Sequence, residues 1–113
     1  MKTVISGSRS IMDYKIVKDA ILKSGFKITE VVSGGAKGVD FLGERWAKEN
    51  GVPVQKFLPE WSKYGRQAAM IRNIEMAGYA EALVAVWDGV SKGTAQMIES
   101  AKTRGIEIYV QEL

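Results

Sequence analysis

Apolar residues along the chain alternate between short β-branched runs and longer stretches with helical spacing. The short runs predict strands at residues 3–5, 28–32, 54–58, 82–87 and 106–110. Between them, apolar residues recur every three or four positions, which predicts amphipathic helices. The run at 82–87 is the most apolar, and we expect a central strand there, because a strand buried on both faces need not alternate.

Capping residues mark the expected ends of the helices. Ser10 is expected to cap the first helix, with Asp13 three residues later as in a capping box. The third helix is expected to carry its apolar side at Met70, Ile74 and Ala77. A glycine follows each helix and is expected to form a left-handed cap; these are Gly25, Gly51, Gly78 and Gly105.

Strands that alternate with helices through short connections are typical of a parallel sheet with right-handed crossovers. We therefore predict a single α/β domain over residues 1–113. Its expected architecture is three-layered and Rossmann-like, with a five-stranded parallel sheet and helices on both faces.

Composition excludes several kinds of chemistry. The chain has no cysteine and no histidine, which excludes disulfides, thiol catalysis, Ser-His pairs and zinc sites built on these side chains. No metal site is predicted. No apolar run is long enough for a bilayer and no signal peptide is evident, so we expect a cytoplasmic protein without a membrane partner. The net charge of +3 suits an anionic partner but is too small to indicate nucleic acid by itself.

The loops that follow four of the strands are rich in small and hydrogen-bond-donating residues. In a parallel sheet these loops share one rim, where ligands bind in open α/β folds. Each loop leads to a helix N-terminus, which attracts anions. Together they favour a phosphate-bearing ligand over ordinary solvated loops. They read GSRS (7–10), SGGAKGVD (33–40), PEWSKYGR (59–66) and WDGVSKGT (87–94), and they bring five cations to the rim: Arg9, Lys37, Lys63, Arg66 and Lys92.

Common phosphate-binding motifs do not fit the glycine-rich loop at 33–40. The loop lacks the Gly-Lys-Ser/Thr ending of a P-loop. Ser33, Gly35 and Gly38 approximate the dinucleotide fingerprint, but they follow the second strand, and no suitable acid follows about 20 residues later. NAD or FAD binding in the usual mode is therefore not expected.

Four stretches in order resemble the SLOG superfamily, which unites DNA-processing protein A (Smf) with the "lonely guy" cytokinin-activating enzymes. The resemblance covers nearly the whole chain and is greatest to the small stand-alone YspA-like members. The stretches are GSR, SGGAKGVD, RN-x-x-M at Arg72, Asn73 and Met76, and GT at Gly93 and Thr94.

The resemblance implies a Rossmann-like domain that binds a nucleotide or a nucleotide-derived molecule; no other cofactor is implied. The pocket floor would be lined by Gly7, Ser8 and Arg9. Phosphate or ribose would be wrapped by Ser33, Gly34, Gly35, Ala36 and Gly38, with Lys37 on the same loop. Arg72 and Asn73 would approach the sugar–phosphate, and Gly93 and Thr94 would offer amides and a hydroxyl to phosphate.

The chain departs from the lonely-guy hydrolases at their catalytic stretch, Pro-Gly-Gly-x-Gly-Thr-x-x-Glu. Met97 stands where that glutamate is expected. Glu99 lies two residues on, about 200° around a helix axis, and is expected to point elsewhere. No catalytic residue is therefore assigned, and Arg72, Asp40 and Asp88 remain candidates.

The sequence alone leaves two interpretations open for several residues. Asp40 either favours a helix N-terminus electrostatically or binds a ribose hydroxyl. Asp88 either contacts a ligand or caps the turn into Gly89. Trp61 and Tyr64 either stack on a base or pack their loop over the sheet.

Three functions follow from these readings. The first is a binding module that senses, carries or sequesters a nucleotide-derived small molecule. The second is a hydrolase that cleaves an N-glycosidic or phosphate bond of a nucleotide. The third, single-stranded DNA binding, has the least support because the charge is modest. A homodimer is suggested by the superfamily and by the helices that carry tryptophan and methionine.

Overall fold

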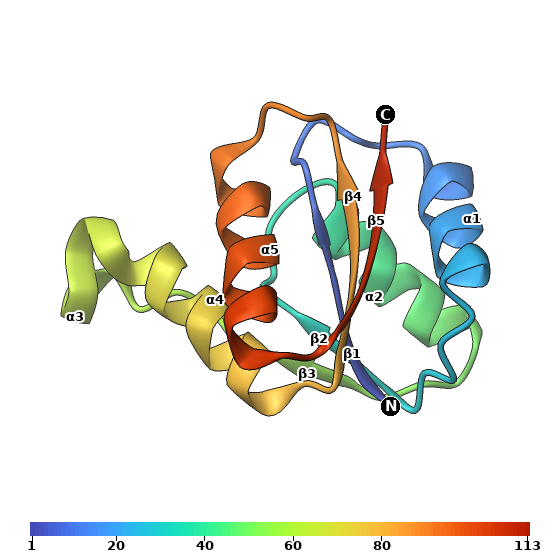
Figure 1. Ribbon diagram of the computed structural model, residues 1–113, viewed down its shortest axis with the longest axis horizontal. Coiled ribbons are helices and arrows are strands. Elements are labelled where there is room, and N and C mark those ends of the chain that lie inside the picture. The colour runs from blue at the N-terminus through green and yellow to red at the C-terminus, as the bar shows by residue number, and fades with distance from the viewer.

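Five parallel strands form one sheet in the order β3-β2-β1-β4-β5 (Figure 1). This computed structural model describes residues 1–113. The predicted α/β Rossmann-like class is confirmed, with every paired strand parallel to its neighbour. The strands are β1 (Lys2–Gly7), β2 (Glu30–Ser33), β3 (Val54–Lys56), β4 (Ala82–Trp87) and β5 (Glu107–Glu112).

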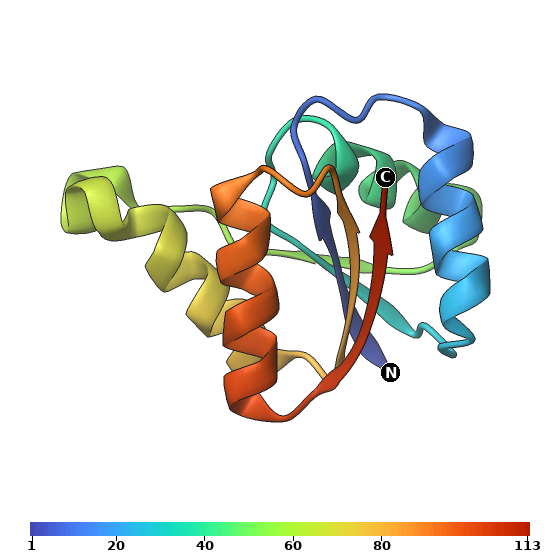
Figure 2. The same cartoon turned by 45° about the horizontal axis from the view of Figure 1, so that its top comes forward.

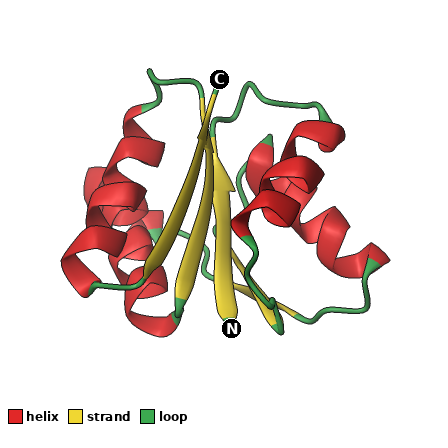
Figure 3. Cartoon of the chain, turned by 45° about the vertical axis from the view of Figure 1, so that its right-hand side comes forward, coloured by secondary structure: helices red, strands yellow, loops and turns green.

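Helices cover both faces of the sheet (Figure 3). They are α1 (Tyr14–Ser24), α2 (Val39–Glu49), α3 (Trp61–Tyr64), α4 (Ala68–Tyr79) and α5 (Lys92–Arg104), with a 3₁₀ turn at Gly65–Gln67. Helices α1 and α2 pack on one face, and α4 and α5 pack on the other. The short helix α3 and the start of α4 stand away from the sheet (Figure 2).

Two apolar cores lie on the two faces, because successive strand residues point to opposite sides. Ile5 and Val84 belong to the core under α1 and α2. Val4 and Leu83 belong to the core under α4 and α5, together with Met97. Strand β4 lies between β1 and β5, so its predicted interior position is confirmed.

The first helix starts later than its sequence predicts. Asp13, not Ser10, is the N-cap of α1, and its carboxylate accepts a hydrogen bond of 3.0 Å from the Lys15 N–H. Ser10 instead lies in the turn after β1. Strands β2 and β5 also begin later than predicted, and β3 ends earlier, at Lys56.

Helix α4 buries a face that differs in part from the one predicted: Ala77 is buried as expected, but Met70 and Ile74 are not. Met70 and Ile74 are 42% and 50% exposed, whereas Arg72 and Asn73 are buried with Met76. The reason is that the inner face of α4 lies against α5 and the rim of the sheet, where polar side chains are needed. Gly78 lies inside α4, which continues to Tyr79, so its predicted cap is wrong. The left-handed conformation predicted at the other three positions is confirmed: Gly25, Gly51 and Gly105.

Candidate ligand-binding site

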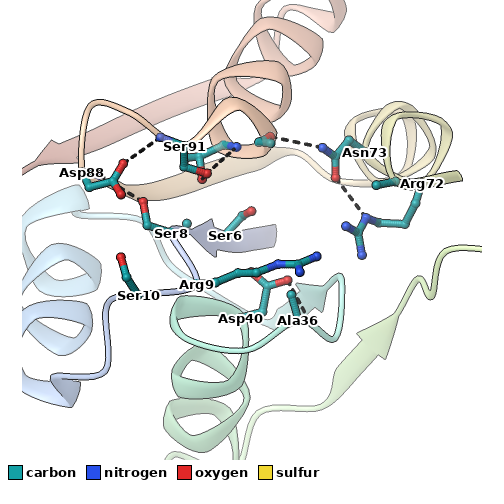
Figure 4. A pocket seen from close by; sticks show the side chains of 14 residues that line it. Ser6, Ser8, Arg9, Ser10, Ala36, Asp40, Arg72, Asn73, Asp88 and Ser91 are labelled. Atoms are coloured by element: carbon teal, nitrogen blue, oxygen red, sulfur yellow. Dashed lines mark hydrogen bonds between the residues drawn. The ribbon is translucent and has the colours of Figure 1, made fainter. Parts of the chain in front are cut away.

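A polar cavity of about 410 Å³ opens at the carboxyl ends of the strands (Figure 4). It lies between β1 and β4, where the order of successive strands in the sheet reverses. Ligands usually bind at this point in open α/β sheets. We call it the rim cavity. Its lining residues are Ser6, Gly7, Ser8, Arg9, Ser10, Ala36, Asp40, Ala69, Arg72, Asn73, Asp88, Ser91, Gly93 and Thr94.

Gly7 and Gly38 let the backbones around the cavity approach one another. A Cβ at Gly7 would lie 2.0 Å from the Val86 carbonyl oxygen. Gly38 has a φ of +73°, and a Cβ there would lie 2.5 Å from the Ser8 carbonyl oxygen. The close approach at Gly7 is between strands β1 and β4, and the one at Gly38 is between the loops that follow β1 and β2.

Ser33 supports the glycine-rich loop from beneath. It is fully buried, its hydroxyl donates to Glu44 Oε2 at 2.6 Å, and it accepts from the Gly35 N–H at 3.1 Å. Lys56 Nζ lies 3.3 Å from the other Glu44 oxygen. Ser33 and Gly38 do not line the rim cavity. A role for either residue in wrapping a ligand stays a prediction.

Arg72 is the most unusual side chain of the site, because it is a buried arginine that forms no ion pair. It is 8% exposed and belongs to no ion pair. Its Nε–H donates to Asn73 Oδ1 at 3.0 Å, and its Nη1 donates to the Gly34 carbonyl. An arginine has five N–H donors, so most of them have no protein acceptor.

Arg9 extends from the loop after β1 toward Arg72 (Figure 4). Burial lowers the pKa of Arg72; the charge of Asp40 opposes this, and the nearby Arg9 charge lowers the pKa further. Two cations thus share one cavity, and neither forms an ion pair, although the Asp40 carboxylate lines the same cavity. An anion bound between them would relieve the repulsion and accept the unused N–H groups.

Asp40 lies on the first turn of α2, 4% exposed, and lines the rim cavity. Its Oδ2 accepts from the Ala36 N–H at 3.2 Å. Burial raises the pKa of Asp40 above its ordinary value of 3.8, although the Ala36 amide and Arg72 act in the opposite direction. The carboxylate therefore both shapes the loop and offers a proton-accepting group to the cavity.

We expect Asp40→Asn to become more stable relative to the wild type as the pH rises. Because the pKa of Asp40 is raised in the folded state, the contribution of this carboxyl group to the stability of the wild type is fully present below pH 3.8 and is lost as Asp40 ionises. The asparagine keeps an acceptor for the Ala36 amide and does not ionise. Urea denaturation of both proteins from pH 3.5 to about pH 8 tests this; a difference that does not change with pH would contradict it.

Asn73 joins α4 to the start of α5. Its amide donates to Gln96 Oε1 at 2.6 Å and to the Gly93 carbonyl at 3.4 Å, and its oxygen accepts from Arg72. Asn73 lines the rim cavity, but both its amide nitrogen and its amide oxygen already form hydrogen bonds within the protein. The hydrogen bond from Arg72 to the Asn73 oxygen orients the Arg72 guanidinium.

Asp88 caps the turn after β4. Its Oδ1 accepts from the N–H groups of Val90 and Ser91, both at 2.8 Å, and these bonds lower its pKa. Its own N–H donates to the Ser8 hydroxyl at 3.1 Å. Asp88 therefore caps the turn into Gly89, which adopts the left-handed conformation. This is one of the two roles expected for it.

The N-terminus of α5 opens onto the rim cavity. Ser91 is the N-cap and accepts from the Thr94 N–H at 3.4 Å, and the Thr94 hydroxyl donates to the same oxygen at 3.1 Å. Gly93 is open, since no atom lies within 4 Å of a Cβ placed there. The other first-turn N–H groups have no intrahelical acceptor and add to the anion-attracting character of the cavity.

Some lining residues were not predicted. Ser91 could have been found from its Ser-x-x-Thr capping pattern. Ser6 ends an apolar strand, and Ala69 depends on where α4 begins, so the sequence carries no clear signal for either. No three acidic side chains lie close enough together to hold a metal ion.

The fold and the rim cavity define a small Rossmann-like protein with a polar cavity, lined by two arginines, at the carboxyl ends of its strands. The family model YAcAr, described as the YspA, cpYpsA-related SLOG family, matches residues 1–64. The chain belongs to this family, which confirms the predicted resemblance, and the assignment supports a nucleotide-related role in broad terms. The chain is 35% identical over 118 residues to the Gene 61 protein of Mycobacterium phage D29, covering 95% of this chain and 93% of that protein.

A solved structure confirms the architecture. The X-ray structure of DNA processing protein A (DprA) from Streptococcus pneumoniae matches with a TM-score of 0.75 at 20% identity. The match covers 96% of this chain but 49% of that one, so this chain spans about half its length. At this identity the likeness concerns the fold. No helix here has the length and apolar character needed to cross a bilayer. The cytoplasmic location and the homodimer stay predictions.

Proposed function

We propose that the chain binds a small phosphate-bearing molecule derived from a nucleotide and acts as its sensor, carrier or sequesterer. The observation that carries the proposal is the pair Arg9 and Arg72, which share the rim cavity and form no ion pair. The N-terminus of α5 supplies further donors at the same place. The loops predicted to hold phosphate or ribose surround this point.

Arg9→Ala is expected to weaken binding of a nucleoside monophosphate about tenfold, because it removes one charge-assisted contact to phosphate. Arg9 is exposed and its side chain forms no ion pair within the protein. Isothermal titration calorimetry of both proteins measures the effect. Arg104→Ala is the matched control, because this exposed arginine ends α5 at the opposite rim. Equal losses in the two variants would show that net charge, not the rim cavity, governs binding.

A hydrolase that cleaves an N-glycosidic bond is the second candidate. Asp40 favours it, because a buried carboxylate with a raised pKa beside Arg72 is a plausible proton acceptor. Glu99 does not line the rim cavity, and Met97 is in the core. Incubation with nucleoside monophosphates separates the two proposals: release of free base that is lost in Asp40→Asn supports the enzyme, and unchanged nucleotide supports the binding module.

Single-stranded DNA binding is a third, weaker candidate, and its support is the fold shared with DNA processing protein A. Binding through phosphates falls steeply with added salt. A labelled oligonucleotide that binds near physiological salt and dissociates as salt increases would favour it over the small-molecule proposal.

A further inference from the structure

A second cavity, of about 700 Å³, adjoins the rim cavity. Arg9, Ala36 and Arg72 line both cavities, so the two guanidinium groups stand between them. We call the second one the outer cavity. Its other lining residues are Gly34, Gly35, Lys37, Leu58, Pro59 and Trp61.

The two cavities differ in chemistry. The rim cavity is lined mainly by serines, charged groups and backbone. The outer cavity has an apolar wall formed by the connection from β3 to α3, which contributes Leu58, Pro59 and Trp61. Leu58 rests directly on the glycine-rich loop: a Cβ at Gly35 would lie 2.6 Å from Leu58 Cδ2. An anion-accepting cavity thus leads into a space with an apolar wall.

Trp61 is available for contact with a ligand. It is 55% exposed, and no residue of α3 is buried. Trp61 therefore does not pack its loop over the sheet, which was the alternative expected from the sequence. An exposed indole that borders a cavity next to two arginines offers a flat surface on which an aromatic ring can stack.

We propose that one ligand occupies both cavities, with its phosphate between Arg9 and Arg72 and its planar base in the outer cavity against Trp61. This inference rests on the proposed function and deepens it, because it makes the ligand a nucleotide with an intact base rather than a sugar phosphate. Trp61 is then a specificity-determining residue. Each cavity has a volume within the range of small-molecule sites.

The test compares ribose 5-phosphate with the four common nucleoside 5′-monophosphates by isothermal titration calorimetry. The wild type is expected to bind at least one nucleotide about fivefold or more tightly than ribose 5-phosphate, which is the lower range of one stacked base. Trp61→Ala is expected to remove this difference and leave ribose 5-phosphate binding unchanged. Trp61→Phe should keep most of it. Met70→Ala is the matched control, since Met70 is exposed on the neighbouring helix and lines neither cavity.

The outcomes separate this inference from the proposed function. Equal binding of ribose 5-phosphate and every nucleotide overturns the base site and leaves the phosphate site standing. An equal loss for both ligand types in Trp61→Ala also overturns it, because Trp61 would then only support the loop. If no ligand binds the wild type, the proposed function and this inference both fail.

Discussion

Arg72→Met is expected to weaken binding of a nucleoside monophosphate about 100-fold or more. Arg72 is buried, so its contact to an anion is poorly screened, and a bidentate contact combines two charge-assisted hydrogen bonds. Methionine has a similar length and no charge. Binding is measured by isothermal titration calorimetry, and thermal denaturation reports whether the variant folds.

Arg72→Lys separates charge from geometry. Lysine keeps the charge but cannot reproduce the planar fork that reaches both Asn73 and the Gly34 carbonyl. We expect an affinity between those of the wild type and Arg72→Met. Unchanged affinity in a folded Arg72→Met protein would place the anion elsewhere.

Gly7→Ala is expected to destabilise the fold by about 3 kcal/mol, the upper end of the usual cost of overpacking. The added Cβ would lie 2.0 Å from the Val86 carbonyl oxygen and 2.7 Å from Val39 Cγ2. The first contact is with backbone of the neighbouring strand β4, which cannot turn aside as a flexible side chain can. Urea denaturation gives the change in the free energy of unfolding.

Gly93→Ala is the matched control for Gly7→Ala. Gly93 also lines the rim cavity, but no atom lies within 4 Å of a Cβ placed there, and it lies in the first turn of α5. Alanine should raise stability by about 0.5 kcal/mol, since it restricts the unfolded chain. If both variants unfold like the wild type, the close packing of β1 against β4 at Gly7 is not as described.

The order of strands and helices was predictable because its signals are local. Apolar runs and helix-ending glycines depend on a few neighbouring residues, and Gly25 and Gly105 indeed adopt the left-handed conformation. The exception is Gly78, which lies within a helix. A glycine marks the end of a helix only if the backbone turns there, and the sequence alone does not record that turn.

The face of α4 was not predictable from apolar spacing. Arg72 and Asn73 are buried because the helix borders a polar cavity, while Met70 and Ile74 remain exposed. Periodicity assumes that the buried face is apolar, and this assumption fails beside a ligand site. The family motif singled out Arg72 and Asn73 as ligand-binding residues; both line the rim cavity, and their contact with a ligand stays a prediction.

The details of the glycine-rich loop also needed the structure. Sequence alone places Ser33 among the ligand-binding residues, but its hydroxyl bonds to Glu44, eleven residues further along the chain. The structure shows the turn-capping bonds of Asp88 to the Ser91 and Val90 amides, and Asp88 also lines the rim cavity, so its contact with a ligand stays a prediction. The contact of Ser33 with Glu44 joins a strand end to a helix, which apolar spacing does not encode.

The central claim is that an anion occupies the space between Arg9 and Arg72. The most direct measurement is a crystal structure of the protein grown with a nucleoside 5′-monophosphate at a concentration that saturates binding in solution. We expect phosphate oxygens within hydrogen-bond distance of the Arg72 guanidinium. A nucleotide found only at distant surface sites, with the rim cavity holding none, would contradict it.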